Sequence, residues 1–431
     1  MTNLARHSAV YTALLITLSL RTTYSYTSGG TLTSQPADRV KLWASKAADR
    51  VKLGTLDVPR IAIGTIKWVP DNGGPSDARL AATFAEAEGC GLNLFDTAER
   101  YGASPFAMLQ QGARAVGLPT AGQAFGGSGE ALLGSLAAGA QPRRLRRGWP
   151  ASQFTPETPR PVLASKFTPV PWRLTPDAVV EAAKTSASRL GVDSLDLYQV
   201  HMPDVVQPFR ALGYTLTKDE RYWEGLARCY HQGVVRNVGV CNYGPTMLAR
   251  CHAYLEKRGV PLASNQINYS LLYRKQGAQE TVDWCLERGI VPMAYYPLAM
   301  GLLTAKWSAE NLPEDAGLRK YFLGDASAGI PPAGVEPLLA TLRAVAQARH
   351  KTPAQVAINW VISKGAVPVV GVTRPEQARD TAAALGWRLS DEEVLLLEAS
   401  ADACAFEFQG SKFKTSDSKF VGYGFEKWRL D

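Results

Sequence analysis

From Val51 onward, short strand-like runs alternate with longer stretches of helical periodicity. This alternation is typical of successive βα units that build a parallel sheet. Eight runs have strand character, at residues 61–65, 91–95, 161–164, 195–200, 236–240, 263–267, 290–295 and 367–371. Because eight parallel strands with helices outside close on themselves, the pattern predicts an α/β fold, a (β/α)8 TIM barrel in a single domain.

Amphipathic helices are predicted between these runs. Two of them, Pro176 to Leu190 and Pro353 to Ser363, carry an apolar stripe suited to packing against a barrel. Gly-rich and Pro-rich segments at 103–127 and 139–160 interrupt the rhythm around a third predicted helix, Gly129 to Leu136. We interpret these segments as long loop insertions that border the substrate entrance.

The two ends of the chain differ from the predicted barrel, which we place at residues 38–400. Residues 1–37 contain Arg6 and Arg21, many Ser and Thr, and no acidic residue until Asp38, which is typical of a cleaved targeting segment. The apolar run Ala9 to Leu20 is too short to span a bilayer, and a transit peptide and a secretory signal peptide both stay open. Residues 401–431 form a C-terminal tail, rich in Phe and Lys, that either folds over the barrel mouth or stays mobile.

Composition argues for a folded enzyme without nucleic acid or metal. Hydrophobic residues make up 46% and charged residues 20% of the chain, which excludes a disordered protein. The net charge is +8, but the one dense basic run, Arg143 to Arg147, is interpreted as a solvated loop. The six cysteines form no CxxC pair, so we expect reduced thiols and no metal site. We also expect no stable membrane insertion, since no run approaches eighteen apolar residues.

The motif ADRVKL occurs twice, at 37–42 and 48–53. Two copies are too few for a stacked repeat. We interpret them as a local duplication without function.

Four polar residues follow successive strand-like runs: Asp96, Tyr101, Lys166 and His201. The carboxyl ends of barrel strands meet at one mouth, so these side chains are expected to lie together. The ammonium of Lys166 lowers the pKa of the Tyr101 hydroxyl, and the carboxylate of Asp96 holds that ammonium in place. A neutral His201 binds a substrate oxygen, and Tyr101 donates the proton that a reduced carbonyl requires.

Six motifs, in this order, resemble those of the aldo/keto reductase family over roughly residues 53 to 400: GLNLFDTAERYG, LASKF, DLYQVHMPD, VRNVGVCNY, NQINYSLLYR and AYYPLAMGLLT. The similarity is greatest to plant and algal plastid members. It implies that the four residues act as described, and that NADP(H) is held without a GxGxxG fingerprint, which the sequence lacks. It also favours a chloroplast location, with a secretory route as the alternative.

The resemblance implies a set of cofactor-binding positions. Asn242 and Gln266 match residues that bind the nicotinamide carboxamide, and Tyr295 matches the ring that stacks on the nicotinamide. Thr373 and Arg374 match positions near the adenosine 2′-phosphate, which a guanidinium binds well, and Gln377 lies near the adenine. The remaining positions assigned to the cofactor site are Cys241, Pro297, Leu298 and Gly371.

Several positions depart from the family pattern. Cys241 and Tyr296 stand where Ser is common, and Thr381 stands where Asn is usual, so the corresponding hydrogen bonds are lost or altered. Trp68 and Trp172 are candidate walls of an apolar substrate pocket, with packing roles as the alternative.

Three functions are compatible with these features. An NADPH-dependent reductase that converts an aldehyde or ketone to an alcohol accounts for all of the site residues. An NADP(H)-binding sensor or structural subunit with little turnover would keep the same fold and nucleotide. An aldolase that uses Lys166 as a Schiff base leaves Tyr101, His201 and the cofactor positions unexplained. The sequence predicts a small-molecule carbonyl substrate, but it identifies neither that substrate nor a protein partner.

Overall fold

Eight parallel strands close into a barrel in the computed structural model, which describes residues 49–69, 77–102, 128–139, 160–170, 172–203, 219–275, 277–307 and 334–404. The strands are β3 (Ala62–Gly64), β4 (Leu94–Asp96), β5 (Val162–Phe167), β6 (Leu197–Val200), β7 (Val238–Cys241), β8 (Leu262–Asn268), β9 (Val291–Tyr295) and β10 (Val367–Gly371). Each pairs in parallel with its neighbours, and β10 closes the ring against β3. The predicted (β/α)8 barrel is therefore confirmed.

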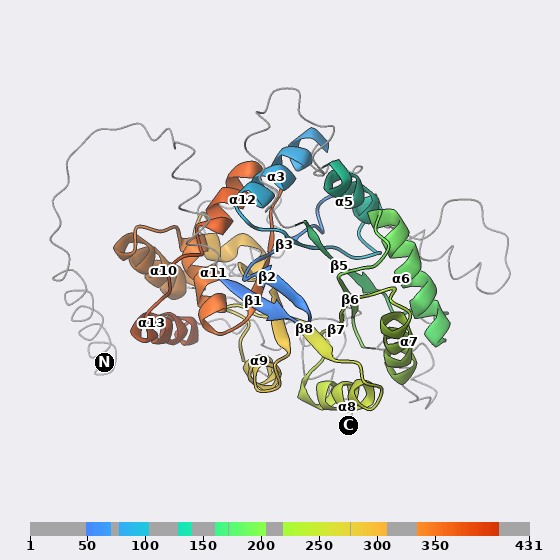
Figure 1. The fold of residues 1–431 in the computed structure, drawn as a ribbon. Helices are drawn as coiled ribbons and strands as arrows, with labels where there is room; N and C mark the ends of the chain where they lie inside the picture. The colour runs from blue at the N-terminus through green and yellow to red at the C-terminus, as the bar shows by residue number, and fades with distance from the viewer. Residues whose placement is uncertain are drawn as a thin grey trace.

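Helices surround this barrel (Figure 1). The ring consists of α3 (Asp77–Gly89), α5 (Ser128–Gly139), α6 (Pro176–Leu190), α7 (Asp219–His231), α8 (Pro245–Glu256), α9 (Ala278–Leu286), α11 (Pro353–Ser363) and α12 (Pro375–Ala382). Two further helices, α10 (Glu336–Ala348) and α13 (Asp391–Asp402), pack against each other beside α11, and a 3-10 helix η3 (Ala299–Thr304) follows β9.

Local capping explains why the predicted helices end where they do. In α6, the Thr175 side chain accepts a hydrogen bond from the backbone N–H of Ala178, Pro176 begins the helix, and Gly191 ends it at a φ of 68°. In α11, the N-cap Thr352 forms a capping box with Gln355, and Pro353 is the first helical residue. These signals lie within a few residues of each terminus, and the predicted bounds of both helices are confirmed.

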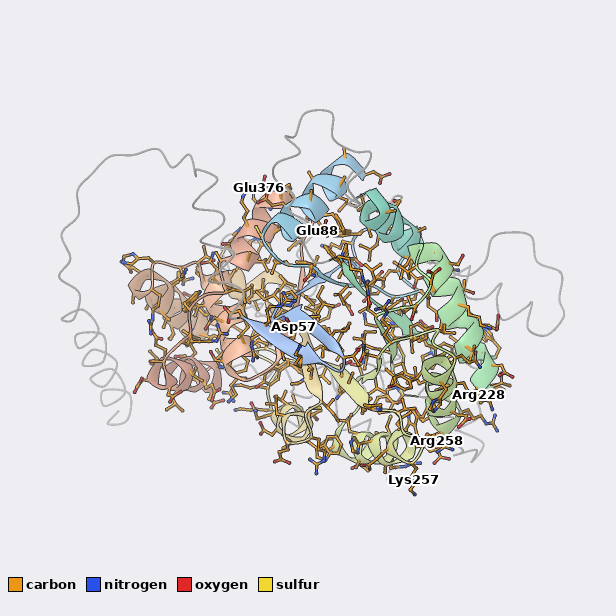
Figure 2. The ribbon with its side chains drawn as sticks, in the orientation of Figure 1. Asp57, Glu88, Arg228, Lys257, Arg258 and Glu376 are labelled. Carbon is orange, nitrogen blue, oxygen red and sulfur yellow. The ribbon has the colours of Figure 1, made fainter. Side chains whose placement is uncertain are left out.

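Apolar residues fill both sides of the strand layer. Most strand residues are buried, because the strands face the barrel interior on one side and the helices on the other. One cluster fills the interior and includes Ala62, Leu94, Val162, Ala164, Leu197, Met293 and Val369. Two larger clusters fill the space between strands and helices. Charged residues such as Arg228, Lys257 and Glu376 lie on the outside of the helices (Figure 2).

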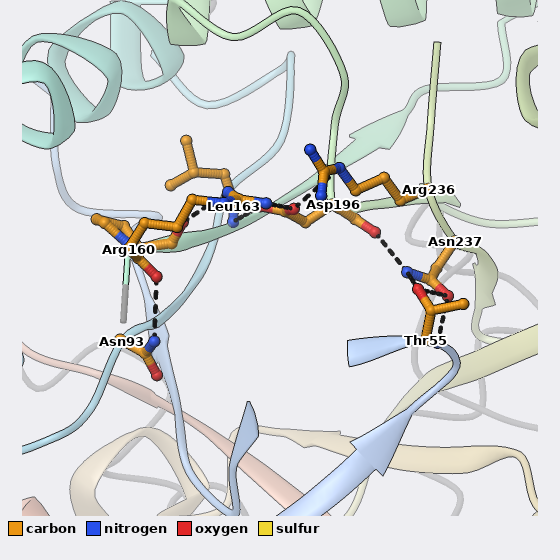
Figure 3. A network of polar contacts seen from close by, with 8 residues as sticks. Thr55, Asn93, Arg160, Leu163, Asp196, Arg236 and Asn237 are labelled. Atoms are coloured by element: carbon orange, nitrogen blue, oxygen red, sulfur yellow. Dashed lines mark hydrogen bonds and ion pairs between the residues drawn. The ribbon is translucent and has the colours of Figure 1, made fainter. Parts of the chain in front are cut away.

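An antiparallel hairpin of β1 (Arg50–Leu53) and β2 (Leu56–Pro59) lies across one end of the barrel (Figure 1). Leu53 and Val58 are fully buried and belong to the interior cluster. The turn is tied to the barrel by Asn237, whose Oδ1 accepts from the backbone N–H of Thr55 at 2.9 Å (Figure 3). The second ADRVKL copy thus supplies β1, and the interpretation of the duplication as without function stays a prediction. The first copy lies outside the described residues.

Other sequence predictions fall partly or wholly outside the described residues. These include the targeting segment 1–37, loop 103–127, nearly all of loop 139–160, and the tail 401–431 beyond Cys404. The domain limits at 38 and 400 stay predictions. All six cysteines are described and free, as expected. Among the described helices, none has the length and apolar character that a bilayer crossing requires.

Candidate active site

The four predicted site residues meet at the carboxyl end of the barrel. Asp96 is the last residue of β4, Lys166 lies near the end of β5, and His201 directly follows β6. The Lys166 ammonium donates to Asp96 Oδ2 at 2.5 Å and to the carbonyl of Thr97 at 2.8 Å. Lys166 is fully buried and Asp96 nearly so, which means that this ion pair is shielded from solvent.

Tyr101 lies on the turn that follows β4. Its ring centroid is 5.4 Å from Lys166 Nζ and 6.1 Å from the centroid of the His201 ring. The turn is closed by a hydrogen bond from the Tyr101 N–H to the carbonyl of Ala98 at 3.0 Å. The structure therefore brings the phenol, the ammonium and the imidazole together, as the sequence predicts.

The electrostatics of the site keep Lys166 charged and Tyr101 protonated. Burial alone would lower the pKa of Lys166, but its acidic neighbours, led by the hydrogen-bonded Asp96 carboxylate, outweigh burial, and the pKa is raised. Burial raises the pKa of Tyr101, and the opposing effect of Lys166 is smaller. Lys166 does lower the pKa of Tyr101, as expected. The overall pKa of Tyr101 is nevertheless raised, which the sequence did not predict, because desolvation of the phenolate is the larger effect.

His201 is neutral at physiological pH in this environment. Burial is the largest cause that lowers its pKa well below the ordinary value, and the positive charges of Lys166 and Arg100 act in the same direction. Its buried Nδ1 has no hydrogen-bond partner among the described residues. The fold therefore leaves part of the hydrogen-bonding capacity of the imidazole unused.

Two predicted nicotinamide-binding amides lie beside these side chains. Gln266 Nε2 donates to Asp96 Oδ1 at 2.9 Å. Asn242 donates from Nδ2 to the carbonyl of His201 at 3.0 Å and accepts from the Tyr295 hydroxyl at 2.7 Å. Since a primary amide has two donors and an acceptor oxygen, both residues keep capacity for a carboxamide.

The other predicted cofactor residues near the end of β9 are adjacent in the structure. Pro297 is buried and Leu298 half-buried, directly before η3. Tyr296 adopts a φ of 54° and packs edge-on against the Tyr295 ring.

Cys241, the last residue of β7, is buried. Burial, opposed in part by Lys166, raises the pKa of its thiol. The neutral thiol is a weaker hydrogen-bonding group than the usual Ser hydroxyl.

The positions predicted for the adenosine phosphate lie where β10 leads into α12. Arg374 is exposed and immediately precedes the helix, whose N-terminus has no side-chain cap. A Cβ at Gly371 would meet nothing within 4 Å, so the backbone there is open. Gln377 Oε1 accepts from the backbone N–H of Thr373 at 2.8 Å. A guanidinium beside an uncapped helix N-terminus suits a phosphate, and these residues fit the predicted nucleotide.

The two candidate pocket tryptophans occupy different environments. Trp68 is fully buried, packs against the rings of Phe84 and Phe95, and donates from Nε1 to the carbonyl of Val372 at 2.7 Å. The structure thus places Trp68 in the packing layer between strands and helices, which favours the packing alternative over a place in the substrate pocket. Trp172 is half-buried, and its role stays a prediction.

Three residues near the site were not singled out from the sequence. They are Thr97, whose carbonyl binds Lys166, and the ion pair of the buried Glu99 with the partly buried Arg173. Thr97 and Glu99 lie inside the FDTAERYG motif, so a closer look at its polar positions would have found them. Arg173 follows Trp172 and carries no local signal of its pairing.

A model of the aldo/keto reductase family matches residues 60–402. The chain is 35% identical over 356 residues to a chloroplastic pyridoxal reductase from Arabidopsis thaliana, with 82% of this chain and 86% of that protein covered. It is 26% identical over 376 residues to an NADH-specific methylglyoxal reductase from Escherichia coli, with 82% and 98% covered.

Solved structures share the barrel. A glycerol dehydrogenase from Gluconobacter oxydans gives a TM-score of 0.62 at 22% identity and covers 83% of this chain and 96% of its own. An aldo-keto reductase from Bombyx mori in complex with NADP gives a TM-score of 0.56 at 19% identity, covering 84% and 95%. Both likenesses show the fold alone. The family match over most of the sequence, the Arabidopsis relative and the site geometry agree, and the chain belongs to the aldo/keto reductase family.

Proposed function

We propose that this protein is an NADPH-dependent reductase of aldehydes or ketones in which Tyr101 donates the proton. The observation that carries the proposal is the buried Lys166 ammonium, held by Asp96 and Thr97 at 5.4 Å from the Tyr101 ring centroid. A fixed positive charge at this point stabilises negative charge that develops on the phenol as its proton leaves. This is what proton donation to a reduced carbonyl requires.

Tyr101 and His201 have different roles toward the substrate oxygen. The raised pKa of Tyr101 keeps its hydroxyl protonated at neutral pH, so the group is available as an acid. The lowered pKa of His201 keeps the imidazole neutral, and it orients the oxygen by hydrogen bonding without competing as the acid. When bound, the nicotinamide cofactor supplies the hydride.

The Schiff-base alternative is disfavoured by the state of Lys166. A lysine that attacks a carbonyl must lose its proton, and aldolase-type sites therefore lower the pKa of that amine. Here burial would lower the pKa of Lys166, but the acidic neighbours led by Asp96 outweigh it, and the pKa is raised. We therefore assign Lys166 an electrostatic role.

For the substrate, we propose a ring-bearing aldehyde of the pyridoxal class as the first candidate. The support is the 35% identity to the pyridoxal reductase over most of both chains. Small oxoaldehydes are the second candidate, from the more distant methylglyoxal reductase.

The test is oxidation of NADPH, followed at 340 nm, with pyridoxal, methylglyoxal and other carbonyls, for the wild type and Tyr101→Phe. We expect turnover that the variant loses by about 10²- to 10⁴-fold, the range for removal of a general acid. Because the ring is kept, thermal unfolding should show equal stability for both proteins. Tight NADPH binding with no turnover on any carbonyl would contradict the proposal and favour the sensor or structural subunit.

A second prediction concerns the choice between NADPH and NADH. Arg374→Met keeps the apolar stem and removes the charge that we assign to the 2′-phosphate. A hydrogen bond to a charged group contributes about 1.5–3 kcal/mol, so the KM for NADPH should rise about 10- to 100-fold. The KM for NADH is the matched control and should not change. An equal effect on both cofactors would show that Arg374 does not bind the phosphate.

We further propose a plastid location. The composition of residues 1–37 and the chloroplastic Arabidopsis relative support it. Imaging of the full chain, fused at its carboxyl end to a fluorescent protein, tests this location against the secretory route.

A further inference from the structure

Glu99 is a buried carboxylate on the turn between Asp96 and Tyr101. Its side chain is 3% exposed. Its Oε1 accepts from the backbone N–H of Thr168 at 2.6 Å and from Arg173 Nη1 at 2.5 Å. Glu99 lies two residues before Tyr101, and Arg173 lies seven residues after Lys166. Neither side chain takes part in the proposed proton transfer.

Arg173 completes this link from the segment that follows β5. Its side chain is 12% exposed, and its guanidinium lies over the Phe167 ring, 5.0 Å from the centroid. Arg173 is thus held by a ring of β5 and paired with a carboxylate from the neighbouring turn. A guanidinium in this position holds two backbone segments at a fixed separation.

Backbone hydrogen bonds also hold the turn that carries Tyr101. The N–H of Glu99 bonds to the carbonyl of Lys166 at 3.5 Å, and the N–H of Gly129 bonds to the carbonyl of Tyr101 at 3.4 Å. The N–H of Thr97 bonds to the carbonyl of Ala164 at 2.9 Å and extends the pairing of β4 with β5. Beyond that point, Glu99 makes the buried side-chain contacts from the turn to the β5 segment. These side-chain bonds are shorter than the backbone bonds made by Glu99 and by the Tyr101 carbonyl, so the Glu99 carboxylate contributes to the position of the Tyr101 ring relative to Lys166.

We propose that Glu99 and Arg173 are positioning residues that hold the Asp96–Tyr101 turn against the end of β5 and thereby fix the Tyr101 hydroxyl beside Lys166. This inference rests on the proposed function. A misplacement of about 1 Å in a reacting group costs on the order of 10²-fold in rate, so a loosened turn should be visible in kcat.

The test compares this pair with a second Arg–carboxylate network, in which the carboxylate is also buried but the Arg160 side chain is 50% exposed. At the opposite end of the barrel, Asp196 is 1% exposed and accepts from the backbone N–H of Leu163 and from Arg160 Nη1, both at 2.9 Å (Figure 3). Asp196 also joins the β5 segment to its neighbour, but far from Tyr101. Asp196→Asn is therefore the matched control for Glu99→Gln, and Arg160→Met is a second control at a more exposed arginine.

We expect Arg173→Met and Glu99→Gln to lower kcat by about 10- to 100-fold while the Kd for NADPH, from protein fluorescence, is unchanged. The basic limb of the kcat–pH profile should move to higher pH. The reason is that Lys166 lowers the pKa of Tyr101, and a displaced ring loses that effect. Arg173→Lys should recover part of kcat, since it keeps the charge. The control variants should lower the melting temperature and leave kcat and its pH profile unchanged.

Variants that keep the wild-type kcat and pH profile would overturn the positioning role. If Arg173→Met does not fold, Glu99→Gln carries the test, because its amide oxygen still accepts from Thr168 while the charge pair is lost. A wild type without turnover overturns the proposed function and this inference together. An active wild type with unaffected variants overturns the positioning role alone.

Discussion

The buried ammonium of Lys166 is tolerated because Asp96 and Thr97 supply oxygens that replace its hydration shell. Asp96 is in turn satisfied on its other oxygen by Gln266. Taking both charges out of water costs several kcal/mol per ion, and only such a complete set of partners offsets it. Removal of the Asp96 carboxylate alone would therefore leave the Lys166 ammonium buried without a counter-charge.

At the residue scale, the neutral state of His201 predicts an acid-sensitive stability. Its folded pKa lies well below the unfolded value of about 6.5, so the unfolded chain binds the proton more readily. The contribution to the free energy of unfolding is full above pH ~6.5 and decreases as the pH falls from there toward the folded pKa. The slope is at most about 1.4 kcal/mol per pH unit, and the partial exposure of the ring makes it smaller.

His201→Gln removes this titration and keeps a polar group of similar reach. Urea unfolding between pH 5 and pH 8 should give a shallower pH dependence for the variant than for the wild type. Parallel curves for the two proteins would show that burial of the imidazole is not linked to stability.

At the scale of elements, neighbouring helices approach so closely that only glycine fits between them. A Cβ at Gly225 of α7 would lie 2.5 Å from Val179 Cβ of α6, and one at Gly134 of α5 would lie 2.6 Å from the carbonyl oxygen of Arg189. The ring of helices therefore depends on the absence of side chains at two interior helical positions, despite the low helix propensity of glycine.

We expect Gly225→Ala to lower the free energy of unfolding by about 1–3 kcal/mol, because the added methyl group forces α6 and α7 apart. Gly89→Ala is the matched control. Gly89 is exposed in the last turn of α3, a Cβ there meets nothing within 4 Å, and the change should stabilise by about 0.4–1 kcal/mol. Urea unfolding measures both. Equal effects would mean that propensity, rather than helix contact, determines the cost at Gly225.

In the molecule as a whole, the candidate site and the β1–β2 hairpin lie at opposite ends of the barrel. The carboxyl end carries Asp96, Tyr101, Lys166 and His201, and the amino end is covered by the β1–β2 hairpin (Figure 1). Beneath this hairpin, the Asp196 network joins the starts of neighbouring strands (Figure 3). This separation is typical of barrels, in which stability and chemistry are located at opposite faces.

Leu53→Ala tests this separation. Leu53 is fully buried in the interior cluster, so the variant should lose about 2–5 kcal/mol of stability. Assayed below its melting temperature, it should keep the wild-type kcat, because no catalytic group is displaced. A reduced kcat in fully folded protein would instead show that the amino end influences the site.

Much of this architecture is predictable from the sequence, because its signals are local. Strand character and helical period identify all eight barrel strands, and capping residues within a few positions place the ends of α6 and α11. The order of polar residues after successive strands also predicts that Asp96, Tyr101, Lys166 and His201 share one mouth, since parallel strands align their carboxyl ends.

The features that could not be predicted depend on contacts between distant parts of the chain. The local residue pattern is enough to predict the barrel and the meeting of Asp96, Tyr101, Lys166 and His201 at one mouth. Only the structure located the β1 hairpin across the barrel, assigned Trp68 to packing, paired Glu99 with Arg173, and showed that burial outweighs Lys166 at the Tyr101 phenol. The physical reason is that desolvation and charge pairing depend on the full three-dimensional surroundings of a group, which a local pattern of residues does not encode.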